Sequence, residues 1–342
     1  MNNTKVLFIV PHYNNHVDLG RCIKSIIANV LCNFEIIVID DGSTEYHRSK
    51  ILEFESLQCL KIVFLNFNQG VSKARNVGLN HAIRNNFSHV LFVDSDDHLT
   101  EKISSSFFGD SDLVFFESVE TIDCYSNFED FKNYIIKKNA NEITSLPNIL
   151  TQYNSRPNKV STLVTCWGKV YRTKIIEDSE LFFNTQMHAF EDIDFLLRFL
   201  CNTTKISFIN KTIYAHTNSD NYNSLTFGGG NKNRLFSFLK LDKPLKRLFD
   251  KYHIKYDKYH FMSCYYSISL VRAAIGRKSL LNKLELYKFL VRRIRSRFIK
   301  KCFSDYNVKR AGGRELLRRF VLLKTPFLLT IYLLFIAKRR YN

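Results

Sequence analysis

The sequence predicts an α/β protein with a doubly wound, mainly parallel sheet, followed by a basic α-helical region. Two patterns predict the sheet: short apolar runs alternate with segments of helical spacing, and the runs are continuously apolar rather than alternating. Continuous apolarity is typical of strands covered on both faces. A third observation, the distribution of charge, separates the helical region from the rest.

The expected elements follow each other as βαβ units. Strands are predicted at 5–10, 34–39, 60–65 and 89–93, with further candidates at 112–116 and 212–216. Helices are predicted at 16–30, 46–56 and 71–86. Between 101 and 157 the pattern loosens, and no topology is predicted there.

Charge divides the chain into two parts. The 342 residues carry 50 Lys and Arg against 32 Asp and Glu, a net charge of +18. Residues 1–231 hold 21 basic and 26 acidic side chains, whereas residues 232–342 hold 29 basic and 6 acidic ones. We therefore expect a globular domain over 1–230 and a helical basic region over 231–342, with Gly228, Gly229 and Gly230 as a flexible joint. The basic excess favours an anionic partner: nucleic acid, acidic lipid or a phosphorylated small molecule.

Two classes of protein are disfavoured. Eight cysteines are scattered with no Cys-x-x-Cys pair, which argues against a zinc ribbon or a dense disulfide framework and favours reduced, mostly buried thiols. The first ten residues lack the pattern of a secretory signal peptide. A cytoplasmic location is therefore expected.

Polar residues follow three of the predicted strands, at the edge where parallel sheets bind ligands. They are residues 11–15, 40–44 and 94–97. The carboxylates of Asp94, Asp96 and Asp97 repel each other unless a cation lies between them. Mg²⁺ or Mn²⁺ bound to a nucleotide diphosphate suits such oxygens. The alternative is a solvated acidic turn that caps the next helix.

Two further motifs have local alternatives. Asp40 and Asp41, before Gly42, could accept hydrogen bonds from a base or a ribose, but Ser43 or Thr44 could simply cap a helix. Residues 70–78 begin a helix and offer Arg75 to a phosphate or to a carboxylate. The alternative for this segment is a surface helix with an ion pair, and its spacing is that of neither a Walker A loop nor a dinucleotide fingerprint.

In order, these segments resemble the family 2 glycosyltransferases with a GT-A fold. The resemblance lies in VPHYNN at 10–15, IDDGST at 39–44, GVSKARNVGL at 70–79, FVDSDD at 92–97, CWGKVYR at 166–172 and FEDIDF at 190–195. It covers roughly the first 230 residues, with nucleotide-sugar binding expected over 1–117 and the acceptor side over 118–230. The sequence departs from the family at His12, where a small or apolar residue is usual, and before Glu191, where a glycine is often found.

The resemblance implies a role for each candidate residue. The implied nucleotide-sugar ligands are Pro11, Tyr13, Asn14, Asp40, Asp41, Arg75, Asp94 and Ser95. Asp96 is implied to bind Mn²⁺ or Mg²⁺, and His216 to be a further metal ligand or a diphosphate contact, the alternative being an ordinary hydrogen-bonded histidine. Asp192 is implied to be the general base, with Glu191 helping to hold the acceptor and Trp167 and Asp97 on the acceptor side.

The implied reaction is inverting transfer of a sugar from a nucleotide-diphosphate donor, with UDP favoured by resemblance. The acceptor would be a hydroxyl of a saccharide or lipid-linked molecule, in the synthesis of a bacterial surface glycan such as lipopolysaccharide or capsule. Two rival functions are a nucleotidyltransferase with the same metal site and a basic nucleic-acid-binding protein. The second is prompted by residues 292–301 and 309–319, but no nucleic-acid-binding motif accompanies them.

The C-terminal end favours a membrane surface. Its apolar part, 326–337, is 12 residues long, shorter than the ~20 needed to span a bilayer. Arg318 and Arg319 precede it, and Lys338, Arg339 and Arg340 follow it. Residues 318–342 are therefore expected to lie on the inner face of the cell membrane. The alternative is a helix packed on the catalytic domain or on another subunit, and a homo-oligomer would also be compatible.

Overall fold

The computed structural model describes most of the chain. The described residues are 4–122, 146–155, 163, 165–187, 189–218, 237–263, 266, 270, 280–304 and 315–340. The chain divides into two compact units, Met1–Leu146 with Val164–Asp220 and Pro147–Leu163 with Asn221–Asn342. The predicted joint at Gly228, Gly229 and Gly230 lies outside the described residues.

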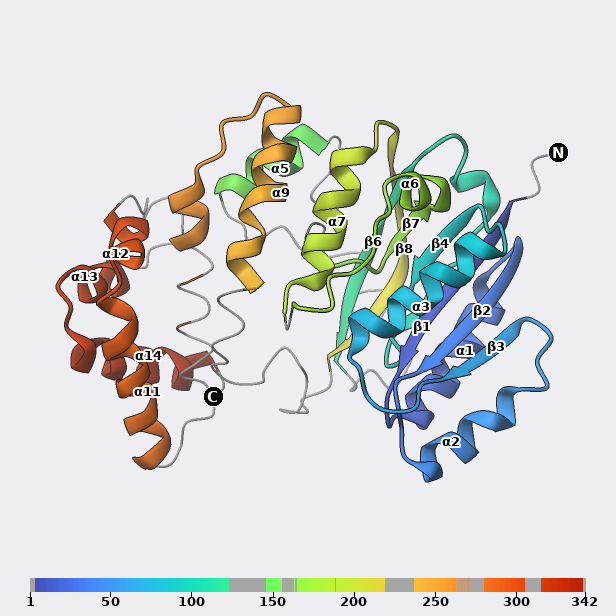
Figure 1. Ribbon diagram of the computed structural model, residues 1–342, viewed down its shortest axis with the longest axis horizontal. Helices are drawn as coiled ribbons and strands as arrows, with labels where there is room; N and C mark the ends of the chain where they lie inside the picture. The colour runs from blue at the N-terminus through green and yellow to red at the C-terminus, as the bar shows by residue number, and fades with distance from the viewer. Residues whose placement is uncertain are drawn as a thin grey trace. The chain divides into compact units, whose positions relative to one another are not determined.

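The first unit is built on one mixed sheet (Figure 1). Its strand order is β3-β2-β1-β4-β7-β6-β8-β5. The first half is parallel, as predicted, and comprises β1 Lys5–His12, β2 Asn33–Asp40, β3 Leu60–Phe64 and β4 His89–Phe92. The second half comprises β5 His98–Leu99, β6 Leu113–Ile122, β7 Lys169–Arg172 and β8 Ile206–Asn218. There β6 and β8 are parallel, while β7 and β5 run antiparallel to their neighbours.

Helices follow the first three strands at the predicted places: α1 His16–Asn29, α2 Glu45–Ile51 with η1 Leu52–Phe54, and α3 Val71–Arg84. The unit also contains η2 Ser105–Phe107, α6 Thr173–Asp178 and α7 Glu191–Asn202, which were not predicted. Both faces of β1 are buried, which explains its continuous apolarity. Val6 and Phe8 share one core cluster with the buried side of α1, whereas Ile9 meets α3 at Gly78. The doubly wound architecture is therefore confirmed.

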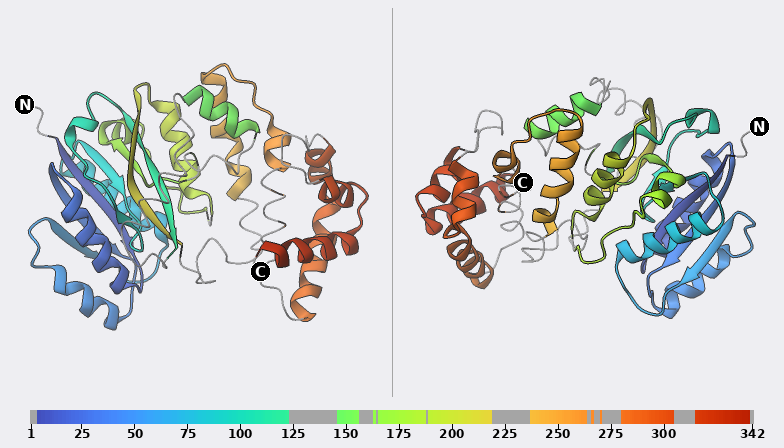
Figure 2. Two further views of the ribbon diagram at one scale, coloured as in Figure 1. Left: turned by 180° about the vertical axis from the view of Figure 1, so that it is seen from behind. Right: turned by 45° about the horizontal axis from the view of Figure 1, so that its top comes forward.

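The second unit is helical (Figure 2). Its helices are α5 Leu146–Ser155, α9 Asp242–Lys251, α11 Leu280–Ile294, α12 Arg297–Ser304, α13 Glu315–Leu322 and α14 Pro326–Arg340. The helices from α11 to α14 pack against one another. The predicted basic helical region is thus present, and among the described helices none is long and apolar enough to cross a bilayer.

Candidate active site

The carboxyl ends of β1, β2 and β4 bring the predicted polar segments to one edge of the sheet. In the parallel register, His12 lies opposite Asp40 and Ile9 lies opposite Phe92, two residues before Asp94. The thiol of Cys22 donates to the Asp94 carbonyl at 3.7 Å, which ties α1 to this edge. The edge is therefore a single locus built by segments that are far apart in the sequence.

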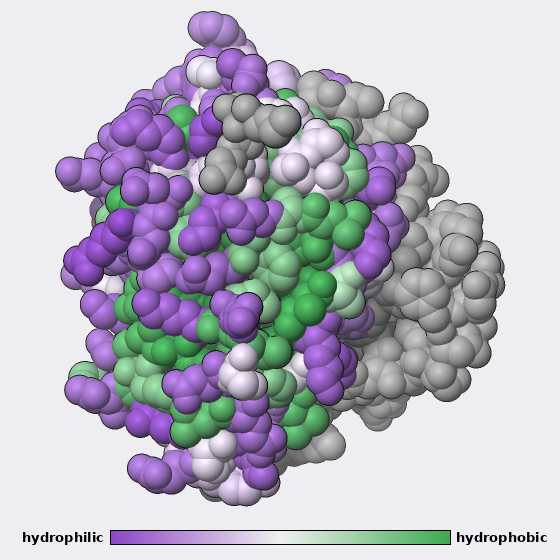
Figure 3. All heavy atoms as spheres, turned by 90° about the vertical axis from the view of Figure 1, so that its right-hand side faces the viewer, coloured by the Kyte–Doolittle hydropathy of each residue, from purple (hydrophilic) through white to green (hydrophobic). Residues whose placement is uncertain are grey.

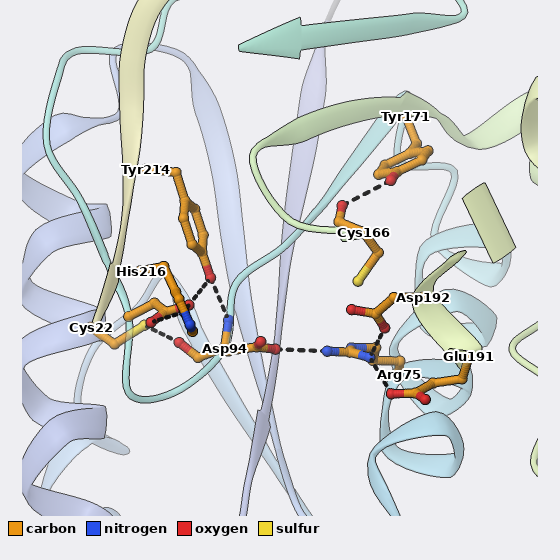
Figure 4. A network of polar contacts seen from close by, with 10 residues as sticks. Cys22, Arg75, Asp94, Cys166, Tyr171, Glu191, Asp192, Tyr214 and His216 are labelled. Atoms are coloured by element: carbon orange, nitrogen blue, oxygen red, sulfur yellow. Dashed lines mark hydrogen bonds and ion pairs between the residues drawn. The ribbon is translucent and has the colours of Figure 1, made fainter. Parts of the chain in front are cut away.

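Arg75 lies at the centre of this locus (Figure 4). Its side chain is 3% exposed, and its guanidinium donates to Asp94 Oδ1 at 2.7 Å and to Asp192 Oδ1 at 2.5 Å. Glu191 Oε1 is 3.9 Å from the same guanidinium. Because a bidentate guanidinium holds two carboxylates in fixed positions, Arg75 links the loop after β4 to the start of α7.

Asn76 explains why α7 meets α3. Its amide side chain donates to the Phe183 carbonyl at 2.9 Å and accepts from the Phe183 N–H at 2.7 Å. The Phe183 ring stacks on Phe195 of α7 with centroids 4.2 Å apart. Arg75 and Asn76 are neighbours on α3, so one turn of this helix both binds the site carboxylates and anchors the segment that leads to α7.

Asp192 and Glu191 occupy the first turn of α7, where the positive end of the helix dipole favours acidic side chains. Burial raises the pKa of Asp192, while Arg75 and the N–H and thiol of Cys166 lower it. Burial and the neighbouring Asp192 raise the pKa of Glu191 to about 7, against the effect of Arg75. Glu191 can therefore exchange a proton near neutral pH.

Side chains of β7 hold the turn that carries Cys166 and Trp167. The buried Lys169 donates to the carbonyls of Thr165 at 2.8 Å and Trp167 at 3.0 Å. The Tyr171 hydroxyl donates to the Cys166 carbonyl at 2.8 Å. These bonds hold the Cys166 side chain toward Asp192, as Figure 4 shows.

Trp167 stacks on two residues of β8. Its ring lies 4.6 Å from Tyr214, with an interplanar angle of 4°, and 5.4 Å from His216. Tyr214 donates to Asp97 Oδ2 at 2.5 Å, and its hydroxyl accepts from the Asp94 N–H at 3.1 Å. The aromatic stack therefore borders the acidic loop after β4.

Asp97 is fully buried rather than exposed on the site surface. Besides Tyr214, its carboxylate accepts from the Thr217 N–H at 2.8 Å and lies 3.1 Å from His216 Nδ1. Burial disfavours the charged form of His216, but the bond to Asp97 raises its pKa to about 9. His216 is thus an imidazolium at neutral pH, which suits a contact with an anion better than ligation of a metal.

Asp96 is the carboxyl that best suits a cation. Burial, reinforced by Asp97 and Asp94, raises its pKa to about 7. A nearby cation would favour the ionised form. No group of three or more His, Cys, Asp or Glu side chains is arranged to bind a metal in the part of the chain that the structure describes. Mg²⁺ commonly needs only one or two protein carboxylates and takes its other ligands from phosphates and water, so Asp96 fits such an ion.

The loops after β1 and β2 are bound to each other and to α3. Asp41 accepts from the N–H groups of Gln69 at 2.7 Å and Gly70 at 2.8 Å. Asp40 Oδ2 accepts from the Ser43 N–H at 3.1 Å and from Arg48 Nε at 3.0 Å. Three of the four carboxylate oxygens therefore already accept hydrogen bonds, while the buried Asp40 Oδ1 accepts none among the described residues and lies 4.0 Å from His12 Nε2.

The remaining predicted nucleotide ligands differ in accessibility. Tyr13 is 49% exposed, Pro11 is buried, and Ser95 is half-buried. Asn14 adopts φ of 50°. It accepts from the Thr44 N–H at 2.9 Å through Oδ1, and its own N–H donates to Ser43 Oγ at 2.8 Å. Asn14 thus fixes the distance between the two loops, and Tyr13 is the side chain most available to a ligand.

Sequence reasoning missed three residues of this locus: Cys166, Lys169 and Tyr214. The first two lie in CWGKVYR, a segment in which only Trp167, the one tryptophan of the sequence, was singled out. Tyr214 precedes His216 by two residues on β8, a spacing that puts both side chains on one face of a strand. This two-residue spacing from His216 was the sequence signal that could have identified Tyr214.

Comparisons with known proteins identify sequences and a structure similar to this chain. Residues 7–104 match the family described as Glycosyl transferase family 2. Glycosyltransferase GlyA of Streptococcus pneumoniae is 28% identical over 221 residues, which cover 62% of this chain and 30% of GlyA. The poly(ribitol-phosphate) beta-N-acetylglucosaminyltransferase TarS of Staphylococcus aureus is 28% identical over 218 residues, 61% of this chain and 35% of TarS. This chain thus spans about a third of the length of these two relatives.

A solved structure extends the likeness in fold. The crystal structure of S. aureus TarS 1-349 in complex with UDP-GlcNAc superimposes with a TM-score of 0.57, at 18% identity, over 99% of this chain and 92% of that one. Residues 7–104, which match the family, contain both α3 with Arg75 and the loop after β4 with Asp94. Residues 7–104 therefore resemble glycosyltransferase family 2, and the mixed sheet of the first unit has a GT-A fold.

Proposed function

We propose that this protein is an inverting glycosyltransferase that moves a sugar from a UDP-sugar to a hydroxyl of a saccharide or lipid-linked acceptor. The observation that carries the proposal is the Arg75 bridge between Asp94 and Asp192. It joins the loop proposed to hold the donor to the carboxylate proposed to activate the acceptor. The complex of the structural neighbour TarS with UDP-GlcNAc supports a UDP-linked donor.

Asp192 is proposed as the general base. A base must be ionised before it takes the acceptor proton, and burial alone would favour the protonated form. Arg75 and Cys166 oppose that effect, so they favour the ionised carboxylate against the effect of burial. Direct attack by the deprotonating hydroxyl on the anomeric carbon inverts its configuration, and Glu191 is proposed to help hold the acceptor.

The other proposed roles follow the positions of the side chains. Donor contacts are proposed for Pro11, Tyr13, Asn14, Asp40, Asp41, Arg75, Asp94 and Ser95. Asp96 would hold Mn²⁺ or Mg²⁺, which supplies positive charge to the leaving diphosphate when bound. His216 is proposed as a second cationic group for the same diphosphate, with a metal-ligand role as the alternative. Trp167 is proposed on the acceptor side, with the buried Asp97 supporting it through Tyr214.

The proposed setting is the synthesis of a bacterial surface glycan, lipopolysaccharide or capsule, at the inner face of the cell membrane. The acceptors made by such pathways are carried on lipids or growing saccharides, which suits a peripheral enzyme with a basic C-terminal region. No nucleic acid partner is proposed.

The test is release of nucleoside diphosphate from a panel of UDP-, GDP- and dTDP-sugars with Mn²⁺. Asp192→Asn should lower kcat by about 10² to 10⁴, the usual contribution of a general base, and leave binding of UDP unchanged. Asp194→Asn is the matched control, because Asp194 lies in the same turn but pairs with Arg198 at 2.7 Å. The control should lower stability and leave kcat intact.

Three outcomes would contradict the proposal. Unchanged turnover in Asp192→Asn would remove this residue from the mechanism. Release of pyrophosphate instead of nucleoside diphosphate would identify a nucleotidyltransferase. Inertness toward every sugar nucleotide of the panel, in a folded sample, would exclude the reaction itself.

A further inference from the structure

Helix α14 is apolar on two opposite sides. Leu329 and Leu333 are fully buried, and α14 packs against α11 and α13. On the other side Phe327, Leu328, Ile331 and Phe335 are between 47% and 65% exposed. At 100° per residue these four side chains fall within an arc of about 100° on the helix. We call these four residues the α14 stripe.

The α14 stripe is unusual for a helix that faces water. A surface helix normally carries polar or charged residues opposite its buried side. Single exposed apolar residues need no explanation, but a contiguous set marks an interaction site. The turn before α14 adds Leu323, which is 70% exposed and adjoins the exposed Lys324. We therefore infer that the α14 stripe contacts an apolar partner.

Charge identifies the kind of partner. Residues 232–342 contain 29 Lys and Arg but only 6 Asp and Glu. Arg319 on α13 and Lys324 in the turn are exposed, and Lys338, Arg339 and Arg340 end the helix. An apolar stripe between basic residues complements anionic lipids, whose headgroups attract the charges while the acyl chains accept the apolar side chains. A nucleic acid would satisfy the charges and leave the stripe in water.

Length decides the orientation. A helix of 15 residues is about 22 Å long, shorter than the roughly 30 Å of bilayer hydrocarbon. The side of α14 opposite the α14 stripe carries Leu329 and Leu333, which are buried within the second unit. The helix can therefore lie in the interface and present one side to lipid.

We propose that α14 docks on an anionic membrane surface, parallel to the bilayer plane, with Phe327, Leu328, Ile331 and Phe335 inserted among the lipids. This deepens, and rests on, the peripheral location proposed above by naming the helix face that makes the contact. Arg319 and Lys324 contribute through attraction to the headgroups. The docking does not depend on which sugar is transferred.

The experiment is flotation of the purified full chain with vesicles of phosphatidylcholine alone or with added phosphatidylglycerol. The unaltered protein should float with the anionic vesicles, less so at high salt. Ile331→Glu combined with Phe335→Glu should reduce partitioning by about tenfold or more, because two apolar contacts become charged. Leu31→Glu is the matched control, since Leu31 is 63% exposed in the first unit and should leave partitioning unchanged. Circular dichroism should show that each variant is folded.

Several results would overturn the docking face. One is failure of the unaltered protein to float with anionic vesicles, and another is equal flotation of the double variant. A third is self-association in sedimentation velocity that the double variant abolishes while vesicle binding is absent, which would make the stripe a subunit interface. Nucleoside diphosphate release without vesicles is measured in parallel. An inert protein that still floats would refute the transferase alone, and an active one that does not float would refute the docking alone.

Discussion

Arg75 and Asp192 are 117 residues apart in the sequence, yet their side chains meet at 2.5 Å. The other arm of the guanidinium binds Asp94. Because Arg75 is almost fully buried, its charge is balanced by these carboxylates rather than by water. Arg75 therefore links the proposed donor loop directly to the proposed general base.

Replacing Arg75 tests that dependence. Arg75→Ala leaves Asp94 and Asp192 close together without their counter-charge, and loss of one partner from a buried ion pair typically costs about 3–5 kcal/mol. The free energy of unfolding, from urea titration, should fall by that amount, and nucleoside diphosphate release should be lost. Arg75→Lys should recover only part of the stability, because an ammonium cannot bind two carboxylates in a planar fork.

Lys73→Ala is the matched control for Arg75→Ala. Lys73 lies on the same helix and is exposed, so its removal should change the free energy of unfolding by no more than about 0.5 kcal/mol. Equal destabilisation by both variants would mean that charge on α3, and not the bridge, is responsible.

The sequence could single out Arg75 as a candidate site residue, but it could not identify its partner. Its position in the 70–78 segment left a phosphate and a carboxylate as alternatives, because local spacing does not report contacts across the fold. The partner depends on Asn76 holding Phe183 and on α7 starting at Glu191. These are tertiary contacts, and no periodic pattern of residues in the sequence indicates them.

The same distinction applies to the fold. The strands ending at His12, Asp40 and Phe92 were predictable because buried parallel strands read as apolar runs. The placement of β7 between β4 and β6 was not predictable from the sequence. This strand has only four residues, and it pairs antiparallel with two strands that lie far from it in the sequence. Likewise, the three carboxylates of DSDD look alike in the sequence, and their difference comes from contacts with β8. Tyr214 and Thr217 of that strand bind the buried Asp97, whereas Asp96 is the carboxylate proposed to hold a cation.

Lys169→Met should loosen the turn under Trp167. The substitution keeps the length of the side chain but leaves the carbonyls of Thr165 and Trp167 without their donor, at a cost of about 1–3 kcal/mol. Trp167 is the only tryptophan, so its fluorescence reports this site alone. Its emission should shift to longer wavelength as the ring separates from Tyr214 and meets water.

Lys174→Met is the control for that shift. Lys174 is exposed on α6 and pairs with Asp178 at 2.8 Å, so its loss should leave Trp167 emission unchanged. An unaltered spectrum in Lys169→Met would show that the aromatic stack holds the turn without the lysine.

Stability should depend on pH through buried histidines. Burial, reinforced by Arg172, lowers the pKa of His89 from 6.5 to about 4. The folded state therefore binds this proton more weakly than the unfolded state does. The stabilising contribution is complete above about pH 6.5 and is lost as pH falls toward 4, by up to about 3 kcal/mol.

His89→Phe should flatten this dependence. Phenylalanine can keep the packing of the ring against Phe108, whose centroid is 5.1 Å away, and it carries no proton-binding nitrogen. Urea titrations from pH 4 to 7 should show a smaller fall in the free energy of unfolding than in the unaltered protein. Part of the fall should persist, because burial also lowers the pKa of His12 to about 4. An identical slope in both proteins would contradict the assignment to His89.

Close packing of α3 on β1 should make Gly78 intolerant of a side chain. A Cβ there would lie 2.5 Å from Ile9 Cγ2 and 2.9 Å from Cγ1, so Gly78→Ala should cost about 1–3 kcal/mol through overpacking. Because Gly78 is one turn from Arg75, nucleoside diphosphate release should fall as well. Gly20→Ala is the control, since the nearest atom to its Cβ is the end of the Phe54 ring at 3.1 Å, which can move.

A double variant identifies Ile9 as the cause. Ile9→Ala alone should cost about 2–5 kcal/mol by leaving a cavity. Combined with Gly78→Ala, the new methyl group enters the space that the isoleucine vacated. The loss in the double variant should therefore be smaller than the sum of the single losses by about 0.5–3 kcal/mol. Strict additivity would mean that Gly78 is required by the helix backbone itself and not by its contact with the strand beneath it.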